Sequence, residues 1–543
     1  MNIVVRKMVG VTEMKGRQIG LPLLIALFIV GCGELGQKKT RGLVPEVDLG
    51  TTIGSLVEVV VPESIRLEGY GLIGGLRGTG SAQCPPQIRA YLRRYILAQL
   101  AERKIDVEKL IDSPDTAVVL VEGIMPTLAS RNQYFDVRVT ALSGTQTTSL
   151  EDGVLLGAEL KTAGSFGIAT RVIADAEGPV FTDKIGRSNT SKRLGYVLAG
   201  GRILDEYKVG LVLHEPNFSV ANSIRNRLIE RFGGGTAKAV LPGEIELTVP
   251  AKYRGQKQRF ISIVKATYLT ENPEITGERI RTFVRKLAGL QDKFTSEIAL
   301  EAIGNESLSK LSILLNVSDE EVRLRAARCM LNLGSEAGLE TLREIALDRG
   351  SAYRVEALEA ITAAASSGDA AAISRTLLRD DDFHIRLAAY EQLRKLDDVA
   401  VAQEPIARNF YLEQISQGGG ETIFVSRSGQ PCIVLFGAPI RCNGNIFVQS
   451  ADGDITINAP AGQGYVSIIR KHPRRPGVIA QLTSSFELAD IIRTLCGEPL
   501  GKGEKGRGGL GVSYADMIAV LKQMCDKGAV GAEFRAGPLP KIG

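Results

Sequence analysis

The chain has 543 residues, which is too long for a single hydrophobic core, so we expect about two to four domains. Hydrophobic residues make up 44% of the sequence and charged residues 23%, as is ordinary for a folded protein. The net charge of only +5, the lack of tryptophan and the low aromatic content of 5% argue against nucleic acid as a partner.

The N-terminal segment has the pattern of an export signal. Basic residues precede an apolar run at 19–30, which has the length of a signal-peptide core but is short for a membrane span. The run ends in Ile29–Cys32, and small or apolar residues directly before a cysteine are typical of a bacterial lipoprotein. We expect residues 1–31 to be a lipoprotein-type signal peptide and Cys32 to carry lipid. The alternative is an ordinary signal peptide with an incidental cysteine.

The polar segment that follows, residues 32–50, is predicted to be a tether. Gly33 stands directly after the cysteine, and by resemblance to other lipoproteins a residue other than aspartate there permits sorting to the outer membrane. We therefore expect a periplasmic protein that contacts the membrane through a lipid anchor. No later stretch reaches 18 apolar residues.

The apolar segment Gly69–Ser81, which reads GYGLIGGLRGTGS, is rich in glycine. A strand this rich in glycine must bend sharply or let another backbone come close. A phosphate-binding loop is rejected, because it needs Gly-Lys before Ser or Thr, and this segment has no lysine. The residues that we single out for a structural or assembly role are Gly69, Tyr70, Gly71, Gly74, Gly75, Gly78 and Gly80.

Strand and helix patterns alternate between residues 51 and 275, which we take as one α+β domain. Ser219 is the expected N-cap of a helix at 222–232, and Asp136 is expected to face solvent from its strand without a catalytic role. Periodicity predicts strands at 56–61, 117–123, 133–142, 209–213, 243–249 and 259–270, and helices at 85–110 and 222–232.

From residue 276 to residue 400 the sequence becomes helical and repetitive. Arg323, Arg354 and Arg386 each open a similar Ala- and Leu-rich segment and recur about every 32 residues. A period of this length with paired helices is typical of a solenoid, and the segments resemble HEAT repeats. The alternative is a plain helical bundle. We expect residues 280–400 to fold as an autonomous helical block that is dispensable for the α+β core.

Strands return in the last part of the chain, residues 401–543, which we predict to be a second α+β domain. Strands are expected at 421–427, 431–436, 445–450 and 464–469, and helices at 487–495 and after Ser513. Ser513 is the expected cap of the last helix and Gly528 its stop, with a short strand after it. The basic runs at 470–475 and 497–511 read as solvated loops, with contact to acidic polymers or lipid headgroups as the alternative.

The cysteines and histidines give no catalytic or metal pattern. None of the seven cysteines has CxxC spacing, and the three histidines are far apart, so we expect no metal, no cofactor and no enzymatic activity. In an oxidising periplasm Cys432 and Cys442 could form a disulfide, since the residues between them suit two adjacent strands. Cys329 lies on an apolar helix face and is expected to be a buried thiol.

The segment GYGLIGGLRGTGS resembles the glycine-rich signature near the mature N-terminus of flagellar P-ring proteins, approximately GYGLVVGLNGTGD. The similarity continues through the strand that holds Asp136 and through a turn where Asn217 replaces the family's usual aspartate. A weaker similarity covers the helix after Ser513. The resemblance spans about residues 53–270 and, more weakly, 420–535, and the helical block departs from the family's pattern.

The resemblance implies an α+β, β-rich core with an inserted all-α, HEAT-like solenoid. It also implies a structural component of the bacterial flagellar basal body. Such a protein forms a homo-oligomeric P ring around the rod at the peptidoglycan layer, next to the L-ring proteins, and acts as part of a bushing during motility. The alternative is a lipid-anchored HEAT-repeat scaffold of another envelope or secretion complex.

Overall fold

The structure is a computed structural model that describes residues 48–542 apart from 62–63, 100–105, 165–170, 187–190, 206–207, 291, 473–474 and 500–507. Three open sheets and one closed barrel occur alongside many helices, which confirms the α+β class. The predicted signal peptide, the tether up to residue 47 and Cys32 lie outside the described residues.

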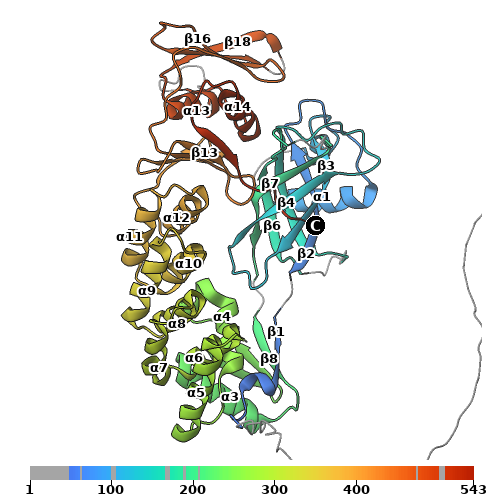
Figure 1. Cartoon of the computed structure of the whole chain (residues 1–543). Coiled ribbons are helices and arrows are strands. Elements are labelled where there is room, and N and C mark those ends of the chain that lie inside the picture. The colour runs from blue at the N-terminus through green and yellow to red at the C-terminus, as the bar shows by residue number, and fades with distance from the viewer. Residues whose placement is uncertain are drawn as a thin grey trace, which may run out of the picture. The chain divides into compact units, whose positions relative to one another are not determined.

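The first part of the chain forms a six-stranded barrel and a separate four-stranded sheet (Figure 1). The barrel has the order β2-β3-β4-β7-β6-β5 and the sheet the order β1-β8-β10-β9, so the barrel is an insertion between two neighbouring strands of the sheet. The elements are η1 (Ile53–Ser55), β1 (Val57–Val60), β2 (Ile65–Gly74), α1 (Pro86–Gln99), α2 (Val107–Ile111), β3 (Ala117–Met125), β4 (Tyr134–Ala141), β5 (Val154–Thr162), β6 (Ala174–Pro179), β7 (Leu194–Ile203), β8 (Val209–Leu213), α3 (Phe218–Phe232), β9 (Ala237–Leu241), β10 (Glu244–Leu247), η2 (Ala251–Gln256) and α4 (Lys257–Ala266).

Each of these two parts has its own core. Alternate residues of the barrel strands point inward, as in Val119 and Val121 of β3 and Val137 and Val139 of β4, all of which are fully buried. The sheet buries only one face, against α3 and α4. The single domain expected at 51–275 therefore contains these two hydrophobic cores and a smaller third cluster beneath α1 and α2.

Three local predictions in this region were wrong. The segment at 259–270 was expected to be a strand, but α4 covers most of it, because Phe260, Ile263 and Val264 all face the sheet at helical spacing. The single helix at 85–110 is two helices, α1 and α2. The N-cap of α3 is Asn217 and not Ser219: its side-chain oxygen accepts hydrogen bonds from the backbone N–H groups of Ser219 at 2.8 Å and Val220 at 3.3 Å.

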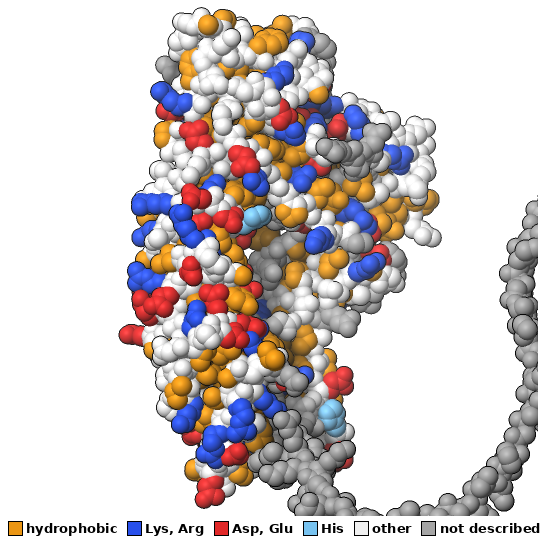
Figure 2. Space-filling view, in the orientation of Figure 1, with side chains coloured by type: hydrophobic (Ala, Val, Ile, Leu, Met, Phe, Trp, Pro, Cys, Tyr) orange, Lys and Arg blue, Asp and Glu red, His pale blue; other side chains and the backbone are white. Residues whose placement is uncertain are grey.

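The middle of the chain is a block of packed helices in which each helix contacts the next. Its charged residues are mixed: in the view of Figure 2, cationic and anionic side chains are interspersed, and many are paired, such as Arg349 with Asp381 at 2.9 Å. The assignment to HEAT-type repeats stays a prediction. The elements are α5 (Pro273–Ala288), α6 (Lys293–Ile303), η3 (Asn305–Ser307), α7 (Leu308–Leu314), α8 (Glu320–Asn332), α9 (Glu336–Leu347), α10 (Arg354–Ala364), α11 (Ser367–Leu377) and α12 (Phe383–Lys395).

Both ends of the helical block share a core with their neighbours. At its start, Ile298 and Ala302 of α6 belong to the core of the four-stranded sheet. At its end, Tyr390 of α12 packs with Val434 and Phe436 of strand β14. These shared cores conflict with the expectation that residues 280–400 fold autonomously, because the isolated fragment would expose both surfaces to water.

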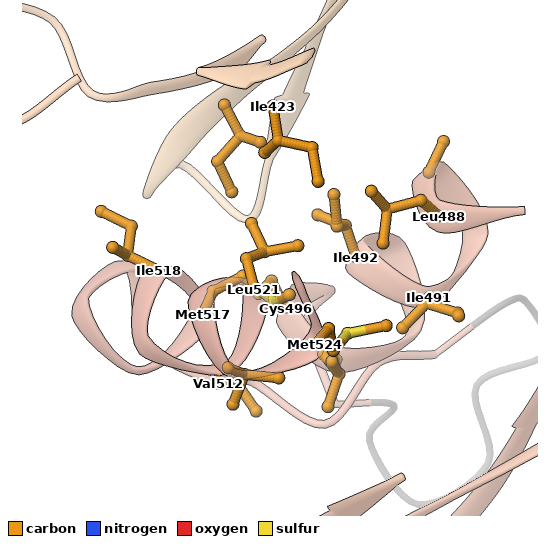
Figure 3. Close-up of a cluster of buried hydrophobic side chains, with 14 of the residues drawn as sticks. Ile423, Leu488, Ile491, Ile492, Cys496, Val512, Met517, Ile518, Leu521 and Met524 are labelled. Carbon is orange, nitrogen blue, oxygen red and sulfur yellow. The ribbon is translucent and has the colours of Figure 1, made fainter. Parts of the chain in front are cut away.

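The last part of the chain contains a mixed five-stranded sheet, ordered β11-β12-β14-β13-β19, and an antiparallel meander of four strands, β15 to β18. The helices α13 and α14 contribute to one core with strands of both sheets (Figure 3). The elements are β11 (Ala402–Ile406), β12 (Phe410–Ile415), β13 (Thr422–Val425), β14 (Cys432–Phe436), β15 (Ile446–Gln449), β16 (Ile455–Ala459), β17 (Val466–His472), β18 (Arg475–Ser484), α13 (Leu488–Cys496), α14 (Tyr514–Asp526) and β19 (Glu533–Ala536).

The predicted ends of the last helix are confirmed. The Ser513 side chain accepts a hydrogen bond from the backbone N–H of Asp516 and caps α14. Gly528 follows the helix with a φ of +69°, the left-handed conformation that commonly ends helices. The buried face of α14 includes Met517 and Leu521, which lie against α13 and Ile423 in Figure 3.

Candidate assembly site

The glycine-rich segment lies where the barrel closes. Strand β2 pairs in continuous register with β3, but its pairing with β5 is interrupted between Glu68 and Ile73. In this gap a Cβ on Gly69 would lie 2.1 Å from the carbonyl oxygen of Glu159, and one on Gly71 would lie 2.7 Å from a methyl group of Leu155. Both glycines are therefore needed for β5 to cross β2 closely, as sequence analysis had predicted for this segment.

The loop after β2 is fixed by backbone hydrogen bonds to two other loops. Gly80 N–H donates to the carbonyl of Pro114 at 2.9 Å, and Thr148 N–H donates to the carbonyl of Thr79 at 2.8 Å. A Cβ on Gly80 would lie 2.1 Å from another carbonyl oxygen. Gly75 and Gly78 have φ values of +81° and +86°, which favour glycine. The loop is thus a rigid, preformed turn.

Helix α1 covers the outside of the barrel beside β2. The Tyr91 hydroxyl donates to the Glu159 carboxylate at 3.2 Å, and the Tyr95 ring lies over Gly157, where a Cβ would be 2.6 Å from the hydroxyl. Burial raises the pKa of Tyr91, and burial also raises the pKa of Tyr95 to about 12. Both phenols are neutral at physiological pH and act as packing and hydrogen-bonding groups.

The exposed part of the site is a small surface formed by the turn and strand β5. Val154 and Leu156 of β5 are 43% and 50% exposed, and Leu156 lies beside Gly74. Arg77, which adopts a left-handed conformation in the turn, pairs with Asp152 at 3.3 Å. We call Gly74, Arg77, Val154 and Leu156 the turn surface. Apolar side chains on a rigid turn suit contact with another protein surface and not binding of a charged ligand.

Tyr70 and Gly74 differ from the other selected residues. Tyr70 is half-buried in β2 opposite Leu120 of β3. A Cβ on Gly74 would make only ordinary contacts, the nearest at 3.4 Å from Leu156, and its φ is not positive. Gly74 is therefore neither crowded nor left-handed, whereas Gly78 has a positive φ.

Asp136 is a structural residue that sequence analysis placed wrongly on the solvent side. Its carboxylate accepts hydrogen bonds from Ala199 N–H at 2.7 Å, Ser428 Oγ at 2.7 Å and Gly429 N–H at 2.9 Å. These contacts join the barrel to the loop between β13 and β14. Nothing in the alternating pattern of β4 could have identified this role, because the partners lie far away in the sequence.

The predicted disulfide is not present in the structure. Cys432 and Cys442 are both free thiols, and they belong to different hydrophobic clusters. Burial raises the pKa of Cys432 to about 11 and that of Cys442 to about 12, so both are protonated and unreactive. Cys329 is a fully buried free thiol, as expected.

The described residues contain neither a candidate metal site nor a candidate membrane-spanning helix. No group of three His, Cys, Asp or Glu side chains in that part of the chain could hold a metal ion. Among the helices formed by the same residues, none combines the length and the apolar character needed to cross a membrane.

A known protein family matches part of the chain. The sequence profile described as "Flagellar P-ring protein" matches residues 52–276. This region is similar to flagellar P-ring proteins. The match takes in the barrel with its glycine strand, the four-stranded sheet and Asp136, and it ends where the helical block begins. The resemblance of the C-terminal region to P-ring proteins stays a prediction.

Individual P-ring proteins agree with the profile. A flagellar P-ring protein of Geobacter metallireducens is 28% identical over 236 residues, 40% of this chain and 61% of the relative. One from Thermotoga maritima is 29% identical over 215 residues, 37% of this chain and 61% of the relative. One from Geobacter sulfurreducens is 27% identical over 262 residues, 45% of this chain and 68% of the relative. The chain thus spans about three fifths of the length of the first two relatives.

Proposed function

We propose that this chain is a structural component of the bacterial flagellar basal body and forms a periplasmic P ring around the rod. The observation that carries this proposal is the match of residues 52–276 to the flagellar P-ring family. In the proposed ring, many copies of the chain surround the rod as part of a bushing, next to the L-ring proteins and the peptidoglycan layer. The proposed role needs no catalytic step.

The physical character of the barrel supports a load-bearing role. A closed barrel has no free strand edges, and its closure here depends on a backbone contact at Gly69 that leaves no room for a side chain. Tight packing of this kind resists deformation. A part of a bushing that holds a rotating rod requires such stiffness.

The turn surface is proposed to lie at or near a contact between subunits. Its support is the exposed apolar pair Val154 and Leu156 beside a turn whose backbone is fixed by hydrogen bonds to two neighbouring loops. A preformed surface loses little conformational entropy when a partner binds. A second copy placed head to tail by a constant rotation closes a ring.

Attachment to the outer membrane through lipid on Cys32 is a further part of the proposal. It rests on the apolar run that ends in Ile29–Cys32. Mass spectrometry of the mature N-terminus should find an acylated cysteine, with more than one chain, since a single acyl chain binds membranes only marginally. A processed N-terminus without lipid would contradict this part and leave the ring proposal intact.

Purification of basal bodies from cells that produce the chain tests the proposed function. Immunogold labelling should place the chain on the periplasmic ring, and deletion of its gene should remove that ring and abolish motility. Basal bodies that keep the ring and the motility of the parent strain after the deletion would contradict the proposal.

A further inference from the structure

The four-stranded sheet of the P-ring region has two open edges. Its order is β1-β8-β10-β9, and all three neighbouring pairs are antiparallel. Within the described residues, no backbone hydrogen bond joins β1 or β9 to anything except β8 and β10, respectively. An open edge presents a row of backbone donors and acceptors to which another strand can add.

The backbone groups that face outward on β1 follow from its pairing. His214 N–H donates to the carbonyl of Leu56 at 3.0 Å, which makes these two residues a hydrogen-bonded pair. Because hydrogen-bonded and non-bonded pairs alternate along an antiparallel ladder, the N–H and C=O groups of Val57 and Val59 point away from β8. They face the open edge.

The same reasoning applies to the opposite edge. Thr248 N–H donates to the carbonyl of Thr236 at 2.8 Å at the start of the β9–β10 ladder. The backbone groups of Ala237 and Ala239 therefore point away from β10. The two edges thus offer backbone groups at the same two-residue spacing.

The directions of the edge strands make the two edges complementary. An antiparallel sheet with an even number of strands has edge strands that run in opposite directions. A second copy rotated about an axis parallel to the strands therefore brings its β1 antiparallel to β9 of the first copy, with the same sheet face outward. Each copy keeps one edge open for the next, which is the arrangement that generates a closed ring.

Side chains at the two edges are also suited to each other. Val60 of β1 and Val240 of β9 are each 49% exposed, and Leu241 is 51% exposed. Glu58, Val60 and Lys238 lie on the outward face of the sheet, and Val240 is exposed at the β-bulge where the β9–β10 register shifts. Val60 and Val240 thus leave apolar surface beside two side chains of opposite charge.

We propose that β9 of one copy adds to β1 of the next copy and that the sheet continues from subunit to subunit around the ring. In the register that places Val59 opposite Ala239, their outward N–H and C=O groups pair. This register sets Glu58 opposite Val240 and brings Glu58 within diagonal reach of Lys238. The inference rests on the proposed ring and names the surface through which the ring closes.

An engineered cysteine pair tests this contact. Glu58→Cys and Val240→Cys would face each other across the proposed contact as a non-hydrogen-bonded pair, the closest kind. Within one chain they are separated by three strand spacings, about 14 Å, whereas a disulfide needs Cα atoms within about 7 Å. A disulfide therefore reports only contact between copies. Cys84 and Cys525 are replaced by serine, so that the native thiols left among the described residues are all buried.

The full-length variant should give, after mild oxidation, a ladder of dimers, trimers and larger species. The matched control, Val60→Cys with Ile479→Cys, places one exposed cysteine on β1 and one on the distant strand β18 and should give only a trace of dimer. If the variant forms rings in electron micrographs but gives no more disulfide cross-linking than the control, the proposed contact is overturned and the ring is not. If the unsubstituted chain forms no high-mass assembly, the proposed ring itself is contradicted.

A charge exchange supplies an independent readout that needs no disulfide. Lys238→Glu alone would set two acidic side chains near each other and should raise several-fold the concentration at which half of the chains assemble. Lys238→Glu combined with Glu58→Lys restores opposite charges and should recover most of the loss. Equal assembly by the parent, single and double variants would overturn the proposed register.

Discussion

The carboxylate of Asp136 on barrel strand β4 accepts a 2.7 Å hydrogen bond from the hydroxyl of Ser428, 292 residues away in the sequence. The same carboxylate accepts the N–H of Gly429 at 2.9 Å and that of Ala199 at 2.7 Å. Ala199 has a φ of +48°, so Asp136 holds a left-handed residue in β7 as well. One side chain thus connects the P-ring region to the C-terminal sheet.

Replacement of Asp136 by alanine should lower the free energy of unfolding by about 1–3 kcal/mol, because partly buried donors lose a charged acceptor. Ser428→Ala removes a single one of the three hydrogen bonds and should cost about 1 kcal/mol or less. Urea denaturation of the purified chain measures both values. An Asp136→Ala protein as stable as the parent would contradict the role assigned to this carboxylate.

Two buried carboxylates, Glu297 and Glu301 of α6, share the guanidinium of Arg259. Although burial opposes its charge, Arg259 and Arg328 hold the pKa of Glu297 below its ordinary value, whereas burial raises the pKa of Glu301. Glu297→Gln should therefore cost about 3–5 kcal/mol of stability, and Glu301→Gln about 1 kcal/mol or less. Denaturant titration at neutral pH measures the stability of the two variants. Equal losses of stability would contradict the different roles assigned to Glu297 and Glu301.

The two carboxylates also give opposite pH dependence. The stability that Glu297 contributes is present above its unfolded-state pKa and is lost as the pH falls through its lowered folded-state pKa. Because the pKa of Glu301 is raised, ionised Glu301 costs stability at neutral pH, and this cost disappears once the pH falls below its unfolded-state pKa. The free energy of unfolding should be measured for both proteins from about pH 7 to pH 3. As the pH falls, the Glu301→Gln variant should become less stable relative to the parent, because the parent alone is relieved of the cost of an ionised Glu301.

The glycines of the candidate assembly site should separate into two classes. Gly69→Val should prevent stable folding, because its Cβ alone would lie 2.1 Å from a carbonyl oxygen. Gly74→Val, whose nearest contact would be an ordinary 3.4 Å, should leave the melting temperature nearly unchanged but reduce high-mass assembly. Calorimetry and sedimentation measure the two effects. Normal assembly of a folded Gly74→Val protein would exclude Gly74 from a subunit contact.

Two of the three repeated arginines of the helical block have a common structural role. Arg323 donates to the carbonyl of Val317 at 3.0 Å, and Arg386 donates to the carbonyl of Asp380 at 2.9 Å, in each case in the turn before its helix. Arg386→Met should cost about 1–3 kcal/mol, because buried carbonyls lose a charged donor. Arg349→Met, at a side chain that is 71% exposed, is the matched control and should change stability by less than about 0.5 kcal/mol. Similar thermal shifts for the two would refute this role.

Local signals in the sequence were enough for several features and not for others. Glycine chemistry predicted the close backbone approach at Gly69, and Ser513 and Gly528 marked the ends of α14, because caps and left-handed glycines act within a few residues. The strand character assigned to α4 failed because its apolar residues are nearly continuous, so neither period stands out. Other features depend on contacts between residues that are far apart in the sequence, which no local pattern reveals. They are the pairing of β1 with β8, between which the barrel is inserted, the contacts of Asp136 and the separation of Cys432 from Cys442.

The ring is tested by electron microscopy and analytical sedimentation of the purified mature chain, with and without its rod partner. We predict closed rings of uniform diameter, with a sedimentation coefficient far above that of the monomer, which is lighter than the 58.3 kDa of the full sequence. A chain that remains monomeric at all concentrations, even with the rod protein present, would contradict the account.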